Sequence, residues 1–307
     1  MTMPSRSMLT WSTALSGLAI FSSLVQTTPG TKEVIFRRGA TASANEWDPI
    51  LVAEEGAKCA DLAVIFARGT FDTPNLGVWV GGPFYDALHR NPDLNIAVQG
   101  VSETDYPADL PGYILQGGSD SCGEAMGRDI QKYHERCPEA AIAAWGWSQG
   151  SQCAHKAMGH LGDAADSLIA LGAFGDPVSV WADTVPYPEK PANTEFLSYC
   201  NGAPTDPLCG HLRDDAPGDP VGFAAWLKDI WDEVSGVHMN EEQEEAFAEL
   251  LVTLPGEAAK LAGQLARDII GGHLQRWMLT PEHFWYGIDG TVDKAAQDLV
   301  EVYKRGL

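Results

Sequence analysis

A serine lies between two glycines in the pentapeptide Gly-Trp-Ser-Gln-Gly at residues 146–150, directly after the apolar run 140–145. A Gly-x-Ser-x-Gly pattern in this context is typical of a nucleophile elbow, where a buried strand ends, turns sharply and continues as a helix. The glycines let backbone pass close to Ser148, and the turn places its hydroxyl at a helix N-terminus, where free N–H groups favour negative charge. The pattern predicts a serine placed to attack an ester carbonyl.

Such a serine needs a general base and an orienting acid, and in hydrolases with this elbow the chain order is Ser, then Asp or Glu, then His. Two acids follow the ends of predicted strands: Asp176, in a Gly-Asp-Pro turn, and Asp206, between Cys200 and Cys209. Spacing alone does not choose between them. The separation of the two cysteines suits a local disulfide around a loop, and such a loop is a good place to hold a carboxylate, which favours Asp206.

Six histidines follow Ser148: His155, His160, His211, His238, His273 and His283. His155 and His160 fall on or near the helix predicted after the elbow. That helix runs away from the active face, so we expect both side chains at the surface and seek the base further along the chain.

Apolar runs that alternate with helix-like segments predict the elements that position these side chains. The predicted strands are residues 62–66, 95–101, 140–145, 168–174 and 195–200, and residues 122–135 are predicted to be helical. Strands separated by helices indicate a parallel sheet covered on both faces, that is, a three-layer α/β/α fold of the α/β-hydrolase type. Ligands of such sheets bind beyond the carboxyl ends of the strands, where Ser148 is expected.

The beginning of the chain predicts export. Between Arg6 and Lys32 there is no charged residue, and residues 1–26 are interpreted as a signal peptide, followed by a leader over residues 27–58. Serines and threonines make this stretch a poor membrane anchor. We therefore expect an extracellular protein whose main domain covers residues 59–307.

Six cysteines in an exported chain predict three disulfides, for which fifteen pairings exist. A metal site is the competing interpretation. Because the chain has no Cys-x-x-Cys and its histidines do not cluster at ligand spacing, we expect neither a metal nor another cofactor.

The formal net charge of −22 disfavours binding to nucleic acid and to anionic membranes. It is compatible with a neutral substrate and with solubility outside the cell. We expect a monomer.

Taken in order, several motifs resemble those of the cutinase family, which includes acetylxylan esterases. They are residues 59–70 with their Ala-Arg-Gly-Thr turn, Tyr-Pro-Ala at 106–108, Cys-Pro at 137–138, the pentapeptide 146–150, the Cys-to-Cys loop 200–209, and His-Phe-Trp-Tyr-Gly at 283–287 before a helix-like end. Trp147 stands where the family usually has Tyr. The resemblance covers about residues 59–209 and 281–305.

The resemblance implies a role for each matching residue. Ser148 is then the nucleophile, His283 the general base and Asp206 the residue that orients the histidine. The oxyanion hole uses the backbone N–H groups of Thr70 and Gln149.

The resemblance also implies which cysteines pair. The implied bridges are Cys59–Cys137 and Cys200–Cys209. Cys122 and Cys153 are left over. Both lie near predicted helix starts, where they could pair.

The sequence departs from the family between the acid loop and the histidine, where residues 210–282 form an insertion. Asn240 could cap an acidic helix through Leu250, and residues 257–270 are interpreted as a further helix. An apolar face at helical spacing is predicted for Phe223, Trp226, Leu227, Ile230 and Trp231. This insertion is either a lid or acyl-binding wall, or a scaffold packed on the core.

The expected protein is a secreted serine esterase that hydrolyses cutin-like or other aliphatic esters, including polymeric or lipid-like substrates. Deacetylation of plant polysaccharide is the second expectation. A non-catalytic secreted effector that keeps the fold for binding is the alternative from another class, and the complete set of Ser148, Asp206 and His283 argues against it.

Overall fold

The fold is described from a computed structural model, which covers residues 41–202, 205–211, 217, 222, 225–226 and 239–306. The predicted signal peptide and the leader up to residue 40 lie outside these residues. Within them, no helix combines the length and the apolar character needed to span a bilayer.

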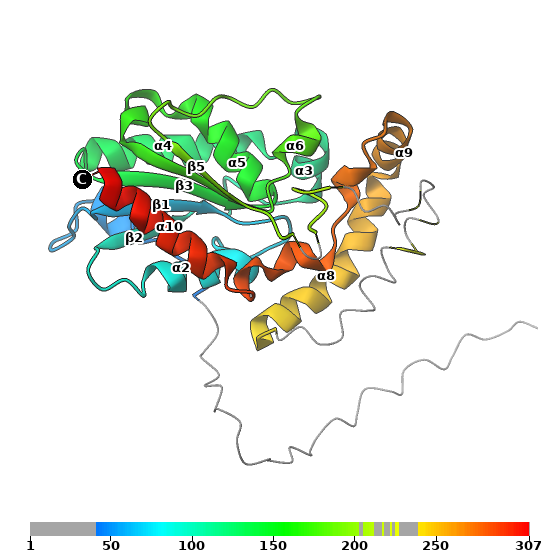
Figure 1. The fold of residues 1–307 in the computed structure, drawn as a ribbon, viewed down its shortest axis with the longest axis horizontal. Helices are drawn as coiled ribbons and strands as arrows, with labels where there is room; N and C mark the ends of the chain where they lie inside the picture. The colour runs from blue at the N-terminus through cyan, green and yellow to red at the C-terminus, as the bar shows by residue number, and fades with distance from the viewer. Residues whose placement is uncertain are drawn as a thin grey trace, which may run out of the picture. The chain divides into compact units, whose positions relative to one another are not determined.

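A five-stranded parallel sheet forms the centre of the domain (Figure 1). Its strands are β1 (Leu62–Ala67), β2 (Ile96–Gly100), β3 (Ala141–Trp147), β4 (Leu168–Phe174) and β5 (Glu195–Tyr199), in the spatial order β2-β1-β3-β4-β5. Every residue of β1 is buried, as expected for a strand covered on both faces. The five predicted strands and the parallel α/β class are confirmed.

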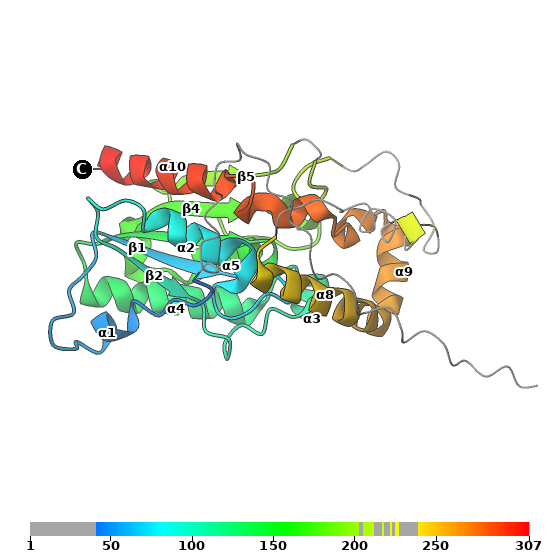
Figure 2. The same ribbon diagram turned by 90° about the horizontal axis from the view of Figure 1, so that it is seen from below.

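The helices are distributed over both faces and over one end of the sheet (Figures 1 and 2). Their bounds are α1 Asp48–Leu51, α2 Gly82–Leu88, α3 Leu110–Gln116, α4 Asp120–Arg136, α5 Gln149–Ala157, α6 Val178–Trp181, α8 Glu241–Lys260, α9 Ala262–Gly271 and α10 Thr291–Gly306. Short helical turns are η1 Gly77–Gly81, η2 Met158–His160, η3 Gly162–Ser167, η4 Leu274–Trp277 and η5 Pro281–Gly287.

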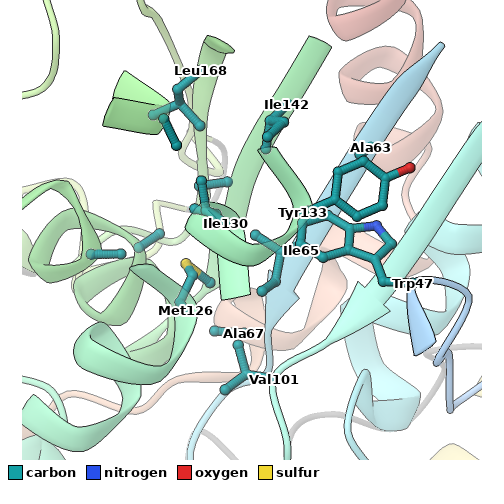
Figure 3. Close-up of a cluster of buried hydrophobic side chains, with 14 of the residues drawn as sticks. Trp47, Ala63, Ile65, Ala67, Val101, Met126, Ile130, Tyr133, Ile142 and Leu168 are labelled. Atoms are coloured by element: carbon teal, nitrogen blue, oxygen red, sulfur yellow. The ribbon is translucent and has the colours of Figure 1, made fainter. Parts of the chain in front are cut away.

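Two apolar cores lie on the two faces of the sheet, because alternate strand residues point to opposite sides. Ala63, Ile65 and Ala67 of β1 pack with α4 and α5 (Figure 3). Leu62, Val64 and Phe66 pack with α2 and α10 instead. The result is the predicted three-layer α/β/α arrangement.

The leader was predicted to continue to residue 58, but its last part belongs to the folded domain. Trp47 is fully buried in the core that α4 covers, and its indole N–H donates to the carbonyl of Ala97 at 3.1 Å. Its ring lies 4.4 Å from that of Tyr133, centroid to centroid (Figure 3). A tryptophan in this position stabilises the fold by burying a large apolar area, so residues 44–58 belong to the domain.

Three disulfides are present: Cys59–Cys137, Cys122–Cys153 and Cys200–Cys209. The second connects α4 to α5, the helix that follows the candidate nucleophile. Each disulfide stabilises the fold mainly by restricting the unfolded chain.

The described part of the insertion is helical. Asn240 caps α8 in a capping box with Gln243, as the sequence predicts, but the helix continues past Leu250 and Pro255 to Lys260. The predicted helix 257–270 is therefore divided between the end of α8 and α9. Of the predicted apolar face, only the half-buried Trp226 is described, and Phe223, Leu227, Ile230 and Trp231 lie outside the described residues.

Candidate active site

Ser148 occupies a strained turn between β3 and α5. Its φ of 58° and ψ of −125° lie in a region that residues other than glycine rarely adopt. Both flanking glycines are needed for the close packing of this turn. A Cβ at Gly146 would lie 2.1 Å from the carbonyl carbon of Gly150, and one at Gly150 would lie 2.0 Å from the carbonyl oxygen of Ala67. The elbow predicted from the pentapeptide is present.

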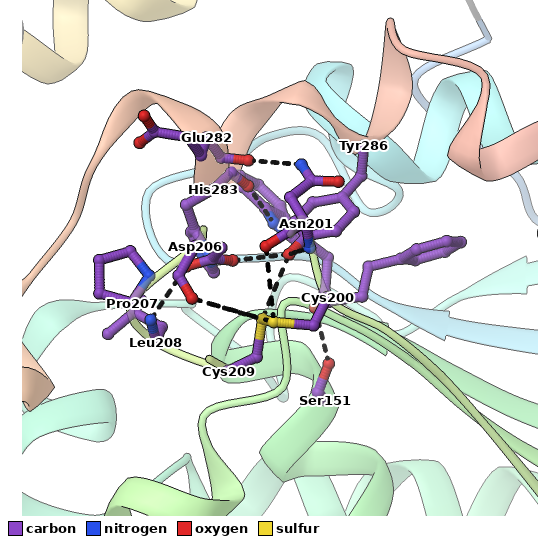
Figure 4. A network of polar contacts seen from close by, with 12 residues as sticks. Ser151, Cys200, Asn201, Asp206, Pro207, Leu208, Cys209, Glu282, His283 and Tyr286 are labelled. Carbon is purple, nitrogen blue, oxygen red and sulfur yellow. Dashed lines mark hydrogen bonds and ion pairs between the residues drawn. A yellow bond between two sulfur atoms is a disulfide. The ribbon is translucent and has the colours of Figure 1, made fainter. Parts of the chain in front are cut away.

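Asp206 holds the ring of His283 (Figure 4). The distance between Asp206 Oδ2 and His283 Nδ1 is 2.7 Å, and both side chains are fully buried. Burial alone would raise the pKa of Asp206. The charge of His283, with hydrogen bonds from His283, Tyr286 and the Leu208 amide, outweighs it and holds the pKa below its usual value. An ionised carboxylate only accepts hydrogen bonds, so Nδ1 carries the proton in this pair.

The other ring nitrogen of His283 faces the site without a partner. Nε2 is buried and has no hydrogen-bond partner within the described part of the chain, and His283 and Ser148 line the same cavity. With Nδ1 protonated, Nε2 of a neutral ring carries the lone pair. The arrangement can therefore accept a proton beside a serine hydroxyl.

Glycine at position 175 lets the end of β4 approach the pair. Gly175 has a φ of +54°, and a Cβ there would lie 2.7 Å from Cε1 of His283 and 2.9 Å from Oδ2 of Asp206. The next residue, Asp176, turns away and contacts Nε2 of His155 at 2.8 Å. Asp176, the alternative acid, therefore contacts His155 and not His283. The expectation that His155 lies at the surface is also corrected, because its side chain is only 14% exposed.

Thr70 and Gln149, the residues that the resemblance assigns to an oxyanion hole, contact each other. Nε2 of Gln149 donates to Oγ1 of Thr70 at 3.0 Å and to the carbonyl of Asp109 at 2.7 Å. Since the Thr70 hydroxyl accepts this bond, its own proton remains available to point elsewhere. The backbone N–H groups of Thr70 and Gln149 donate to no acceptor among the described residues. These two amides and the Thr70 hydroxyl are therefore available as donors.

Arg68 and the Tyr-Pro-Ala segment, to which the sequence analysis gave no role, support the loop that carries Thr70. The Arg68 guanidinium donates to the carbonyl of Tyr106 at 2.7 Å, and the Tyr106 hydroxyl donates to the carbonyl of Arg68 at 2.9 Å. Phe71 and Ala108 both have positive φ, and the amide of Phe71 donates to the carbonyl of Ala108 at 2.8 Å. These reciprocal bonds explain why the Ala-Arg-Gly-Thr turn and the Tyr-Pro-Ala segment occur together.

A cavity of about 170 Å³ adjoins Ser148. Its lining is mostly apolar and comes from two sources. The sheet domain contributes Thr70, Phe71, Leu110, Tyr113, Ile114, Trp147, Ser148, Leu208, His283 and Phe284. The insertion contributes Leu254, Ala258, Leu265, Arg276, Trp277 and Leu279. Across the described ranges, no group of three His, Cys, Asp or Glu side chains is arranged to hold a metal ion.

Comparison with known proteins gives the family of this chain. The family model described as Cutinase matches residues 58–217, which is more than half of the chain. The chain belongs to the cutinase family. The matched segment contains Thr70, Ser148, Gln149 and Asp206, whereas His283 and most of the insertion lie beyond its end.

Individual cutinases match shorter stretches. A cutinase from Botryotinia fuckeliana is 38% identical over 125 residues, which are 40% of this chain and 60% of that protein. Cutinase 4 from Emericella nidulans is 33% identical over 156 residues, 50% of this chain and 62% of that protein. The chain thus spans about three fifths of the length of these curated relatives.

Among solved structures, a Trichoderma reesei cutinase in complex with a phosphonate inhibitor is 30% identical, with a TM-score of 0.43. The similarity covers 57% of this chain and 71% of that one.

This cutinase-family chain uses its unusual Trp147 as a structural donor. The indole N–H donates to the backbone carbonyl of His283 at 2.9 Å, and the two rings lie 5.5 Å apart, centroid to centroid. Gly69 allows this close approach, because a Cβ there would lie 2.4 Å from the indole. The tryptophan therefore fixes the histidine loop against the elbow.

Tyr286 is a site residue that the sequence analysis missed. Its hydroxyl donates to Oδ2 of Asp206 at 2.6 Å, and the same oxygen contacts His283 (Figure 4). The hydroxyl also accepts from the backbone N–H of Asn201 at 3.1 Å. Burial, together with the negative charge of Asp206, raises the pKa of Tyr286, so the hydroxyl stays protonated. The feature of the sequence that could have indicated this role is the position of Tyr286, three residues after His283 in the same motif.

We expect Tyr286→Phe to lower kcat/KM about tenfold and to move the acid limb of its pH profile to higher pH. Removing the phenol leaves more negative charge on Asp206, which stabilises protonated His283. Hydrolysis at pH 6 should therefore fall further than at pH 8. The measurement is the pH dependence of kcat/KM for a soluble ester.

The matched control is Tyr199→Phe, which removes a 2.6 Å bond from a tyrosine to Asp298 on α10. It should leave the acid limb in place. A Tyr286→Phe enzyme with a lower melting temperature and an unmoved acid limb would show that the phenol is only structural.

Proposed function

We propose that the chain is a secreted serine esterase that cleaves aliphatic carboxylic esters through an acyl-enzyme. The observation that carries the proposal is the partnerless Nε2 of His283, which shares a cavity with Ser148 while Asp206 holds the opposite nitrogen. This arrangement supports transfer of the serine proton to a base of fixed tautomer.

In the proposed first half-reaction, Oγ of Ser148 bonds to the ester carbonyl carbon while its proton passes to Nε2 of His283. Negative charge develops on the carbonyl oxygen, and the amides of Gln149 and Thr70, with the Thr70 hydroxyl, stabilise it. The bond from carbon to the leaving oxygen then breaks, and His283 returns the proton to that oxygen. An alcohol leaves, and the acyl group remains on Ser148.

The second half-reaction repeats these steps with water as the nucleophile. His283 takes a proton from water as its oxygen bonds to the acyl carbon. The bond to Oγ of Ser148 breaks, and the proton returns to that oxygen. The carboxylic acid leaves, and Ser148 is regenerated.

The apolar lining of the cavity favours aliphatic acyl groups over acetylated polysaccharide, because a buried hydrocarbon chain gains free energy with its length and an acetyl group has little to bury. Three disulfides support the proposal of secretion, since such bonds persist mainly in oxidising compartments.

A fluorophosphonate probe with a fluorescent tag tests the function without a known substrate. We expect rapid stoichiometric labelling of the native protein at Ser148, identified by mass spectrometry of the tagged peptide. The Ser148→Ala protein and heat-denatured wild type should remain unlabelled. A folded wild-type protein that fails to react would favour the non-catalytic effector instead.

A further inference from the structure

One wall of the cavity beside Ser148 comes from a part of the chain beyond the family match. Leu254 and Ala258 on α8, Leu265 on α9 and Trp277 on η4 line it, and all lie after residue 217. Leu110, Tyr113 and Ile114 of α3 line the same cavity, and Leu254, Ala258 and Trp277 pack against them. Helices α8, α9 and α3 gather at the same end of the domain in both views (Figures 1 and 2). The insertion thus supplies a large part of the lining of this cavity.

Arg276 attaches this wall to the catalytic domain. The side chain is 3% exposed, and its guanidinium donates to the carbonyl of Val180 at 2.9 Å, to Asp183 at 2.8 Å and to Thr184 at 2.9 Å. It also lies 4.0 Å from the ring centroid of Trp181. Separating these groups would leave a buried charge unpaired, which is costly.

Further hydrogen bonds lie at both ends of the segment from α8 to η4. Asp268 of α9 is 2% exposed and accepts from the Trp277 indole at 2.8 Å, and the hydroxyl of Tyr113 donates to the carbonyl of Arg276 at 2.9 Å. At the start of α8, the side chain of Gln243 donates to the carbonyl of Val78 at 3.1 Å. The wall is therefore fixed in place by polar contacts as well as by apolar packing.

The cavity is small. Its volume of about 170 Å³ is close to that of an apolar cavity of about 150 Å³ that holds one benzene molecule, a group of six carbons. We infer that the insertion completes an apolar acyl site that selects medium-chain acyl groups of about six carbons over acetyl groups and long fatty acyl chains. This inference rests on the proposed esterase function and specifies its substrate class.

The first test is the kcat/KM of the wild-type protein for p-nitrophenyl esters from acetate to palmitate. Each methylene that enters an apolar site adds about fourfold to kcat/KM, so the values should rise from acetate to hexanoate by about two orders of magnitude. They should fall beyond octanoate, where the chain no longer fits. A profile with its maximum at acetate or palmitate overturns the inference.

The second test changes the volume of the site. Ala258→Leu fills the cavity and should lower the ratio of hexanoate to acetate kcat/KM at least tenfold. Ala259→Leu adds the same atoms to an exposed position on the same helix and should leave the ratio unchanged. Leu265→Ala should move the optimum to longer esters, whereas Ile270→Ala, which alters an 88% exposed side chain of α9, should not.

The outcomes separate the inference from the function on which it rests. If no ester is hydrolysed and the fluorophosphonate leaves Ser148 unlabelled, the proposed function and the inference both fail. If esters are hydrolysed but Ala258→Leu and Leu265→Ala change the chain-length profile no more than their controls do, the esterase stands and the acyl site is wrong. The wild-type profile decides the matter even if one filled or enlarged variant does not fold.

Discussion

Ser148→Ala and His283→Ala should each lower kcat for ester hydrolysis by roughly a millionfold. In the proposed mechanism, the serine supplies the oxygen that bonds to the acyl carbon, and the histidine removes the proton that would keep this oxygen a poor nucleophile. Because the two act in one step, the double variant should be little slower than either single variant. The measurement is kcat under saturating ester, with melting temperature as a check of folding.

Two exposed residues provide matched controls. Ser198→Ala on β5 and His160→Ala after α5 remove the same side chains from the surface. Both should retain wild-type kcat. A Ser148→Ala protein that keeps more than a thousandth of the activity would mean that another group attacks the ester. A double variant far slower than either single variant would mean that the two residues work independently.

Much of the fold could be predicted because its signals are local. Apolar runs of strand length marked all five strands, and the pentapeptide at 146–150 marked the turn between β3 and α5. Burial of β1 on both faces requires a continuous apolar run, which is visible without knowledge of its partners. The Asp206–His283 pair was reached through ordered motifs, because spacing alone left Asp176 open.

What could not be predicted depends on contacts between distant residues. Trp47 has no periodic pattern around it, and it is assigned to the domain by its burial against Tyr133 and its bond to Ala97. The apolar side chains of α8 indicate an apolar face, but not that this face meets Ser148. The bond from Trp147 to the carbonyl of His283 spans 136 residues, so no spacing rule reveals it. Packing of the insertion, rather than helix propensity, decides what the cavity can hold.

The choice between the two acids is open to a direct comparison. Asp206→Asn should lower kcat by about ten-thousandfold, because an amide that donates to Nδ1 forces the proton onto Nε2 and leaves no base for Ser148. The shape of the side chain is nearly unchanged, so the fold should persist. Asp176→Asn should lower kcat no more than about tenfold, since this carboxylate contacts His155 and not His283.

Melting temperature separates catalysis from stability in this comparison. The Asp176–His155 pair is almost buried, with 10% and 14% of the side chains exposed, so Asp176→Asn should lower the melting temperature by a few degrees. Asp206→Asn should lose activity far beyond any change in stability. The reverse result, an active Asp206→Asn enzyme and a folded but inactive Asp176→Asn enzyme, would assign the orienting role to Asp176. Such a result would require His283 to turn away from the carboxylate that lies 2.7 Å from it in this structure.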